Sequence, residues 1–384
     1  MITIGNRHVM KHFTLHVRLT KKCNADCSYC SSWQAEPITY MSVSDFKKSI
    51  DFIVDNLLPL YGYNRSNSHT ITLQYIGGEI AIIPKGILYQ YVFYARTRFQ
   101  EVFSNIIDGV QSNLVTSERR VKAMSNLFGK NIGTSVDSLG SARTISKSPD
   151  KYREILERNI DFLRVNRNTN PGRIFVVDAE GIQNTEFEME RANNEGYDLT
   201  LRPVFLGGRD IGACTPDEIQ NEFSRLFDIW FMKYNISVNP FYHLVNGILY
   251  EKTGLKDFTF KVGCPFQKDC AEVSLDLEPD GSLFVCLDMA DSNQLPLGNA
   301  ITSEFNIDLW NMIKHRKEHY DLNCKSCTWL STCQGGCMSE ALHSSKSMYG
   351  KTELCSSWKT IFSKIEIGIE NYGLQNVINW FSKI

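Results

Sequence analysis

Apolar and polar residues along the first 235 positions follow two different periods. Residues 13–19 (FTLHVRL) alternate between apolar and polar, which is typical of a strand with one buried face. Residues 42–58 repeat apolar side chains at helical spacing, and Ser42 or Ser44 can cap this helix. Both patterns recur, with further predicted strands at 70–76, 105–111, 131–136, 173–178 and 199–204, and further predicted helices at 85–103, 117–128, 150–165, 186–195 and 216–234.

This alternation predicts six strand–helix units before residue 235. Strands that alternate with helices form a parallel sheet with right-handed crossovers, either open or closed into a barrel. In such barrels the functional loops lie at the carboxyl ends of the strands. Residues 235–260 show no clear period and are expected to connect this region to the rest. Beyond them, residues 271–278 and 282–287 predict two strands joined by the turn Pro279-Asp280-Gly281.

The overall composition excludes several classes of protein. The chain has 384 residues and a formal net charge of −2, with 42% hydrophobic and 22% charged residues, which is ordinary for a globular protein. A nucleic-acid binder would carry a basic excess, so no nucleic-acid partner is expected. No apolar run reaches membrane-spanning length, and the N-terminus lacks the apolar core of a signal peptide. We therefore expect a cytoplasmic protein with no membrane association.

The unusual feature is the count of twelve cysteines, which fall into groups. In a cytoplasmic chain of this size, grouped cysteines indicate metal binding rather than disulfides. One cysteine, Cys214, stands alone. The first group holds Cys23, Cys27 and Cys30, and the second holds Cys264, Cys270, Cys286, Cys324, Cys327, Cys333, Cys337 and Cys355.

The first group has the spacing C-x3-C-x2-C directly after the first predicted strand. Three thiolates leave one coordination position of a metal centre unfilled, which suits a reactive site better than a structural zinc site. The segment C23-N-A-D-C27-S-Y29-C30 matches the CxxxCxxC motif of the radical S-adenosylmethionine (radical SAM) superfamily. Gly77-Gly78-Glu79, after the second predicted strand, resembles the GGE motif of that family.

The resemblance implies a specific chemistry for these residues. Cys23, Cys27 and Cys30 would hold a 4Fe–4S cluster whose fourth iron binds S-adenosylmethionine, and reductive cleavage of that cofactor would give a 5′-deoxyadenosyl radical that abstracts hydrogen. This chemistry belongs to the cofactor, and the protein supplies orientation and shielding from water.

Several residues are candidates for contact with that cofactor. Gly77 and Gly78 would let the backbone approach its amino group because they lack Cβ. Glu79 either assists there or fixes the turn, and Tyr29 either stacks on the cofactor or packs in the protein. Further candidates are polar residues at predicted strand ends, which resemble positions that face the adenosyl group or a carboxylate: Gln111, Asn113, Ser135, Asp137 and Arg202. The alternative for Ser135 and Asp137 is a helix cap, and the alternative for Arg202 is an ion pair at the rim of the barrel.

The second group matches the seven-cysteine SPASM motif, found in C-terminal extensions of radical SAM proteins that carry auxiliary 4Fe–4S clusters. Cys264 supplies an eighth thiolate. By resemblance to sulfatase maturases, Cys264, Cys270, Cys286 and Cys337 would hold one auxiliary cluster, and Cys324, Cys327, Cys333 and Cys355 the other. Zinc is the alternative metal for this region. Cys214 remains as a free thiol.

The resemblance also implies a fold and a domain organisation. We expect a partial (β/α)6 TIM-like barrel followed by a small cysteine-rich SPASM domain with a β-hairpin and helices. The expected boundaries are 1–235 for the barrel, 236–262 for the connection, and 263–384 for the SPASM domain, which ends in a C-terminal helix over residues 356–384. The expected cofactors are three 4Fe–4S clusters and S-adenosylmethionine.

SPASM enzymes mostly oxidise side chains of peptides or proteins, and two branches compete here. Peptide maturases form thioether or carbon–carbon crosslinks on a ribosomally made precursor, and anaerobic sulfatase-maturating enzymes oxidise Ser or Cys to formylglycine. In the latter an Asp directly follows the third cysteine of the first auxiliary set. Here Leu287 follows Cys286, and Asp288 comes one residue later. On a strand that shift turns the side chain to the other face, which favours crosslinking, with Asp288 as the candidate base or as a solvated turn residue.

The hypothesis of a peptide-modifying enzyme implies certain partners. About a dozen residues precede the first predicted strand, which leaves no room for a fused leader-binding domain. The precursor peptide would bind the chain directly, for example along an edge strand, or be presented by a separate leader-binding protein. An electron donor such as flavodoxin or ferredoxin would reduce the first cluster. The rival of a different class is a non-catalytic zinc- or cluster-binding interaction protein.

Overall fold

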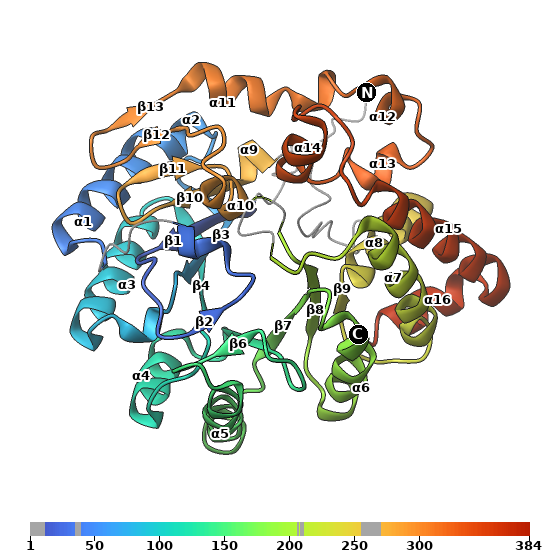
Figure 1. Ribbon diagram of the computed structural model, residues 1–384. Helices are drawn as coiled ribbons and strands as arrows, with labels where there is room; N and C mark the ends of the chain where they lie inside the picture. Colours follow the sequence, from blue (N-terminus) through green and yellow to red (C-terminus); the bar gives the residue numbers. More distant parts are fainter. Residues whose placement is uncertain (1–11, 35–39, 206, 208–210, 255–269) are drawn as a thin grey trace.

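Six parallel strands form the wall of an open barrel in the computed structural model, which describes residues 12–34, 40–205, 207, 211–254 and 270–384 (Figure 1). They lie side by side in chain order, so each neighbouring pair is joined by a crossover that contains a helix. The strands are β1 (His12–Arg18), β3 (Ser66–Ile76), β4 (Phe103–Gln111), β5 (Ile132–Val136), β7 (Gly172–Val177) and β8 (Leu199–Pro203).

Helices cover the outside of this wall (Figure 1). They are α1 (Val43–Phe52), a π-helical turn (Ile53–Leu57) that continues into α2 (Leu58–Leu60), α3 (Lys85–Phe99), α4 (Glu118–Phe128), α5 (Pro149–Arg167), α6 (Thr185–Glu195) and α7 (Pro216–Trp230). The predicted alternation is therefore confirmed, and the helix expected over 85–103 ends earlier because Phe103 already begins β4.

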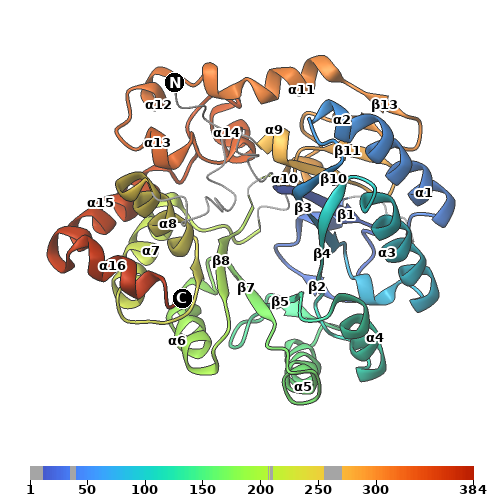
Figure 2. The same ribbon diagram turned by 180° about the vertical axis from the view of Figure 1, so that it is seen from behind.

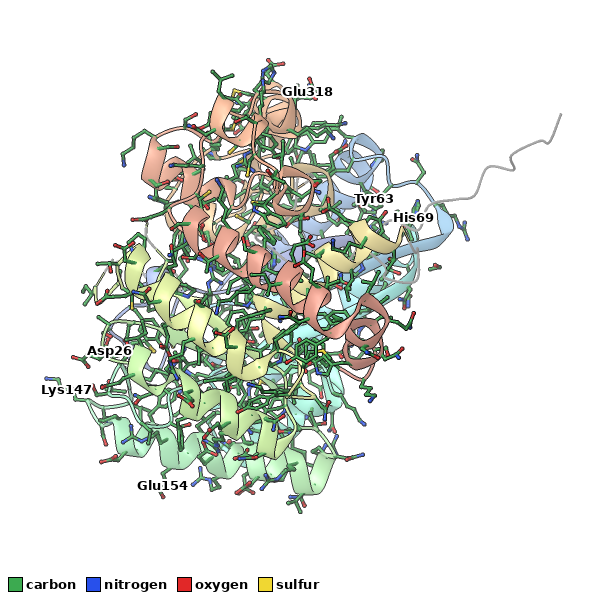
Figure 3. All side chains as sticks on the ribbon, turned by 90° about the vertical axis from the view of Figure 1, so that its right-hand side faces the viewer. Asp26, Tyr63, His69, Lys147, Glu154 and Glu318 are labelled. Atoms are coloured by element: carbon green, nitrogen blue, oxygen red, sulfur yellow. The ribbon has the colours of Figure 1, made fainter. Side chains whose placement is uncertain are left out.

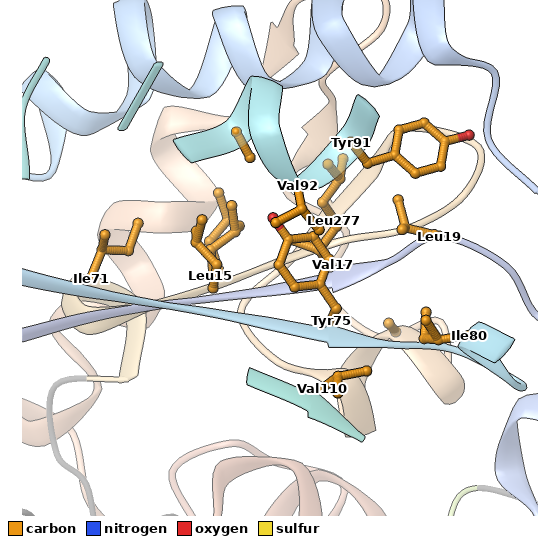
Figure 4. Close-up of a cluster of buried hydrophobic side chains, with 14 of the residues drawn as sticks. Leu15, Val17, Leu19, Ile71, Tyr75, Ile80, Tyr91, Val92, Val110 and Leu277 are labelled. Atoms are coloured by element: carbon orange, nitrogen blue, oxygen red, sulfur yellow. The ribbon is translucent and has the colours of Figure 1, made fainter. Parts of the chain in front are cut away.

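The alternating pattern of β1 separates the two faces of the wall. Leu15 and Val17 are fully buried on the helix side, and Val17 stands in register with Tyr75 of β3. Tyr91 and Val92 of α3 pack against this layer (Figure 4). The residues between them, such as His16, point to the barrel interior, because successive strand residues face opposite sides.

The cysteine-rich region extends the same sheet rather than standing apart from it. The hairpin strand β10 (Ser274–Leu277) pairs in parallel with β1, from Thr14↔Ser274 to Val17↔Leu277. Beyond it, β11 (Ser282–Phe284), β12 (Gly298–Asn299) and β13 (Glu304–Phe305) continue the sheet in antiparallel order. The predicted fold class, a partial barrel followed by a cysteine-rich domain with a hairpin and helices, is confirmed. The domain boundaries stay a prediction.

Four details of the predicted pattern differ from the structure. The expected strand at 271–278 begins with the helical turn α9 (Cys270–Val273), and β10 starts only where Ser274 meets Thr14 of β1. The expected strand at 282–287 ends at Phe284, and α10 (Leu287–Asp291) follows. The described part of 235–260 forms β9 (Val238–Asn239), which pairs with β8, and α8 (Phe241–Thr253). The expected C-terminal helix is two helices, α15 (Cys355–Tyr372) and α16 (Leu374–Phe381), separated by Gly373 with φ 81°.

The remaining helices of the cysteine-rich region lie along the open side of the barrel, between the strands β10–β13 and helix α15 (Figures 1 and 2). They are α11 (Ile307–Lys314), α12 (Leu322–Lys325), α13 (Leu330–Cys333) and α14 (Met338–Ser345). Glu318, in this region, and Glu154, on α5, mark opposite ends of the molecule (Figure 3). In the same view Tyr63 packs edge-on against His69 at the start of β3, with ring centroids 5.6 Å apart.

Buried apolar residues form two cores, one for each half of the barrel. The first joins β1, β3 and α1–α5 to the β10–β11 hairpin. The second joins β7, β8 and α6–α8 to α15 and α16, which lie beside α7 and α8 (Figure 2). The cysteine-rich region therefore contributes to both cores, and it spans the two edges of the open barrel. No helix in the described ranges is long and apolar enough to cross a membrane.

The shared second core gives a stability prediction. Ile365 of α15 is fully buried in it, and Lys364 beside it pairs with Asp228 of α7. We expect Ile365→Ala to lower the free energy of unfolding by about 2–5 kcal/mol, because the substitution leaves a cavity in a core shared with the barrel. Equilibrium urea unfolding measures this change.

The control is Lys359→Ala on the exposed side of the same helix, which we expect to shift stability by less than about 0.5 kcal/mol. An unfolding transition of the barrel that is unchanged by Ile365→Ala would contradict the shared core.

Candidate active site

The first cysteine group lies in the loop after β1, at the carboxyl edge of the sheet. The loop is held by its backbone on two sides. Gly78 N–H donates to the Thr20 carbonyl (2.8 Å), and Glu79 N–H donates to the Lys22 carbonyl (2.9 Å). On the other side, β2 (Asp26–Cys27) pairs with β6 (Arg143–Thr144), which places Cys27 beside Arg143. Residues 77–79 after β3 therefore contact the cysteine loop directly.

Close packing against this loop explains the two glycines. A Cβ on Gly78 would lie 2.3 Å from the Lys22 carbonyl oxygen, and a Cβ on Gly77 would lie 2.6 Å from the Thr20 carbonyl oxygen. Both distances are shorter than van der Waals contact with a backbone atom. The described contacts thus give these glycines a packing role against the cysteine loop.

Glu79 is a buried carboxylate that accepts hydrogen bonds from its own turn and from the end of β4. One oxygen accepts from Ala81 N–H and from the Ser112 hydroxyl, both at 2.7 Å, and the other accepts from Asn113 N–H at 2.7 Å. Burial raises the pKa of Glu79, and these donors oppose the increase. In this structure Glu79 fixes the turn and ties the end of β3 to the end of β4.

Asn113 carries that connection to the cysteines. Its Nδ2 group donates to Asn24 Oδ1 at 2.9 Å and lies 3.7 Å from Cys23 Sγ. Tyr29 packs under the guanidinium group of Arg143, which lies 5.4 Å from the ring centroid. Arg143 also donates to the Tyr152 hydroxyl at 3.3 Å. The cysteine loop is thus enclosed by polar contacts from three neighbouring strand ends.

The three thiols lie close enough to affect one another's titration. Burial raises the pKa of Cys23 to about 12, and the charges of Glu79, Cys27 and Cys30 add to the increase. Burial likewise raises the pKa of Cys27 and Cys30. Thiols held together without a cation resist ionisation, and a bound metal would reverse this by stabilising the thiolates. The donor set fits an iron–sulfur centre with soft thiolate ligands.

Polar side chains at the carboxyl ends of β4, β5 and β8 line the barrel interior next to this loop. Gln111 donates to the Ser135 hydroxyl at 3.3 Å. Asp137 is buried and packs over Gly140. Arg202 reaches away from the strand end to form an ion pair with Asp288 of α10. Gln111 and Ser135 therefore contact each other, whereas Arg202 forms the rim ion pair that was the alternative for it. The role of these residues at a cofactor stays a prediction.

The described cysteines of the second group gather in two sets. Burial raises the pKa of Cys286, and Cys337 and Cys270 are among the charges that add to it. Burial raises the pKa of Cys333 to about 12, with further increases from Cys355, Cys324 and Cys327. These are the groupings that the resemblance implies for two auxiliary clusters. Cys264, the expected fourth ligand of the first set, lies outside the described residues.

No three Cys, His, Asp or Glu side chains in the described part of the chain stand at the distances of a single metal ion. In a 4Fe–4S cluster each thiolate binds a different iron, so the ligands stand further apart than those around one ion. The two sets of thiols fit such clusters by their donor chemistry, and their role as ligands stays a prediction.

A buried ion-pair network joins the loops that carry the first and second cysteine groups. Arg18, at the end of β1, pairs with Glu278 (3.2 Å) and with Asp291 of α10. Lys21 also pairs with Glu278, at 2.7 Å, and Ser31, next to Cys30, donates to Asp291. The side chains of Arg18, Glu278 and Asp291 are each at most 6% exposed.

A pocket of about 80 Å3 lies between the end of β8 and the cysteine-rich region. Because residues 287–291 are helical, the strand argument that placed Asp288 on the opposite face is wrong: Asp288 lines this pocket together with Arg202. Sequence reasoning missed its other polar members, since none belongs to a recognised motif. They are Cys214, Glu340 and Glu353, beside the apolar Phe205.

Comparison with solved structures identifies the fold. The chain is similar to native anSMEcpe, an anaerobic sulfatase-maturating enzyme, with bound S-adenosylmethionine (AdoMet), at 18% identity and a TM-score of 0.72 over 97% of this chain and 100% of that chain. The same values describe anSMEcpe with AdoMet and Kp18Cys peptide. Streptococcus suis SuiB bound to precursor peptide SuiA matches at 13% identity and a TM-score of 0.57, over 90% and 75% of the two chains.

These similarities confirm the radical SAM/SPASM resemblance at the level of the fold. No family model matches the sequence, and no curated protein matches it either.

The contacts of the glycine loop give a prediction. We expect Gly78→Ala to destabilise the protein by about 1–3 kcal/mol, because the added Cβ would overlap two backbone carbonyls of the cysteine loop. Gly86→Ala, in the first turn of α3, is the matched control, since its added Cβ meets no atom within 4 Å and replaces glycine in a helix. We expect it to be neutral or stabilising by up to about 1 kcal/mol. Thermal unfolding measures both, and equal effects would contradict the packing role.

Proposed function

We propose that this chain is a radical SAM enzyme that modifies side chains of a ribosomally made precursor peptide by forming an intramolecular thioether or carbon–carbon crosslink. The observation that carries the proposal is that three thiols, Cys23, Cys27 and Cys30, lie together in the loop after β1, and that the cysteine-rich region holds two further sets of thiols. Structural neighbours in complex with peptides support a peptide substrate.

In the proposed enzyme Cys23, Cys27 and Cys30 hold a 4Fe–4S cluster, and the two thiol sets of the cysteine-rich region hold auxiliary clusters. When bound, the first cluster and S-adenosylmethionine supply the radical chemistry, and the auxiliary clusters supply an electron acceptor. An electron donor of the flavodoxin or ferredoxin class would provide the reducing electron.

The chain's own residues would position and shield the reactants. Asn113 and Asn24 form the wall beside Cys23, and Gln111 and Ser135 present hydrogen-bonding groups to the interior. A polar interior with a fixed hydrogen-bond pattern orients a small polar cofactor without reorganisation during the reaction. Arg143 lies beside Cys27 and favours the negative charge that a thiolate-ligated cluster carries.

Formylglycine formation is the second candidate, and one observation favours it. Asp288 lines the pocket at the end of β8 although it is shifted by one residue from the position expected in sulfatase maturases. The helical turn after Cys286 brings it there, so the one-residue shift no longer argues against this reaction.

The first test of the proposal uses the cysteine loop. We expect anaerobically reconstituted wild-type protein to form 5′-deoxyadenosine with S-adenosylmethionine and reductant, because three thiolates leave one iron open to the cofactor. Cys30→Ala should abolish this product and remove about four irons per chain. Ser28→Ala, an exposed non-ligand in the same loop, should retain both. Wild-type protein with fewer than about eight irons would contradict the three-cluster assignment.

The second test identifies the reaction. We expect co-expression with the peptide of a neighbouring short reading frame to give a product that has lost two hydrogens, whose fragment ions are missing between the joined residues and which does not react with a hydrazide. Formylglycine made from Ser loses the same mass but carries an aldehyde that the hydrazide labels. An aldehyde on that peptide, or only on a co-expressed sulfatase segment, would contradict crosslinking and support formylglycine formation. Tandem mass spectrometry distinguishes these results.

A further inference from the structure

The pocket at the end of β8 brings together side chains from four separate parts of the chain. Arg202 comes from β8 and Asp288 from α10, while Glu340 lies in the first turn of α14 and Glu353 precedes α15. A space of about 80 Å3 holds several waters and therefore admits an amino-acid side chain. Three carboxyl groups and one guanidinium group meet there.

The carboxyl groups of Asp288 and Glu340 have different partners. Asp288 forms an ion pair with Arg202, so its negative charge is already compensated. Glu340 Oε2 has no contact with solvent and accepts no hydrogen bond from any described residue, although part of the side chain faces the pocket. Buried polar atoms are almost always hydrogen-bonded, so an exception that faces a pocket suggests a partner that arrives with a ligand.

The surroundings of Glu340 favour its uncharged form. Burial raises its pKa to about 8, and the charges of Asp288 and Glu353 add to this, whereas Arg202 opposes it. On its own helix His343 lies one turn further, packed edge-on against Phe205 with ring centroids 5.4 Å apart. Cys214 lines the same pocket. A carboxyl group with a pKa near the working pH exchanges protons most effectively.

Three residues of the pocket lie close in sequence to cysteines of both auxiliary thiol sets. Glu340 follows Cys337 by three residues, Asp288 follows Cys286 by two, and Glu353 precedes Cys355 by two. A side chain that enters the pocket would therefore lie beside the residues that would bind the electron acceptor.

From this geometry we propose that Glu340 is a catalytic residue that accepts the proton released when the substrate side chain is oxidised. The inference rests on the proposed peptide oxidation and adds its proton acceptor. Arg202 and Asp288 form one wall of the pocket and orient the substrate.

The 5′-deoxyadenosyl radical removes one hydrogen atom from a substrate C–H bond and becomes 5′-deoxyadenosine. The carbon then bonds to a second side-chain atom X as the X–H bond breaks. One electron leaves to an oxidant of the iron–sulfur class, and the proton goes to the Glu340 carboxylate. The substrate has lost two hydrogens, and the protein has gained one proton and one electron.

The experiment compares Glu340→Gln, Glu340→Asp and Asp288→Asn in reconstituted protein with the peptide of the neighbouring reading frame, deuterated at the reacting carbon. We expect Glu340→Gln to lower product formation by about 10²-fold or more, while deuterium still enters 5′-deoxyadenosine, because hydrogen abstraction precedes loss of the proton. Glu340→Asp should restore part of the product. Glu318→Gln, an exposed glutamate of the same region, is the matched control and should behave as wild type.

The pH profile gives a readout that a purely structural role would not change. A carboxyl group accepts a proton only when it is ionised, so product formation by wild type should rise as pH increases through about 8. This rise should be absent from Glu340→Gln and should occur at a different pH in Glu340→Asp. Iron content and circular dichroism equal to those of wild type exclude misfolding of the variants. If Glu340→Gln loses iron, the displacement of the pH profile in Glu340→Asp tests the role of Glu340 instead.

Three results would overturn the role of Glu340. They are wild-type product formation by Glu340→Gln, loss of deuterium transfer in that variant, and loss of product in Asp288→Asn alone. Wild-type protein that makes no modified peptide would instead contradict the proposed function itself, so the two failures are distinguishable.

Discussion

The parallel pairing of β10 with β1 is the constraint on which the arrangement of the site depends. It places Glu278, at the end of β10, beside Arg18, at the end of β1, and Asp291 of α10 supplies the second anion. A buried guanidinium group needs compensation, and removal of one partner from such a network costs several kcal/mol. Burial and the nearby Glu278 raise the pKa of Asp276 well above its usual value, which favours the uncharged form of that carboxyl group. The cysteine loop and the auxiliary hairpin are consequently joined by buried ion pairs as well as by strand pairing.

The opposite edge of the barrel is closed by different means. There α15 and α16 bury apolar side chains against α7 and α8, and Trp380 Nε1 donates to the Tyr234 carbonyl at 2.9 Å. The cysteine-rich region is therefore attached by charge and sheet pairing at β1 and by apolar packing near β8. The pocket that holds Arg202, Asp288 and Glu340 is lined by α10, which follows the β10–β11 hairpin, and by residues 353–354, which precede α15, so its lining comes from distant parts of the sequence.

Sequence patterns predicted what depends on local period or fixed spacing. The alternation in β1 and the cysteine spacings are of this kind. The break at Gly373 was not predicted, although a glycine after a helical run was available as a signal of a helix end. The helical turn at 270–273 was missed because an apolar run does not show where pairing with β1 begins. The packing roles of Gly77 and Gly78 depend on the path of the cysteine loop, and the position of Glu340 depends on a tertiary contact between α14 and β8. No local pattern encodes either feature.

The two neighbouring carboxyl groups show how one pocket can supply two kinds of chemistry. Arg202 compensates the charge of Asp288, and this ion pair holds the Arg202 guanidinium group at the rim of the barrel. Burial, together with the charge of Asp288, raises the pKa of Glu340 to about 8, although Arg202 opposes this increase. Pairs of acids with such different environments typically divide positioning from proton transfer. Residues within three positions of Cys286, Cys337 and Cys355 line the same pocket, so the proposed proton acceptor and the proposed electron acceptor would both lie near the substrate side chain. A substrate side chain held there would lose the proton and the electron without moving.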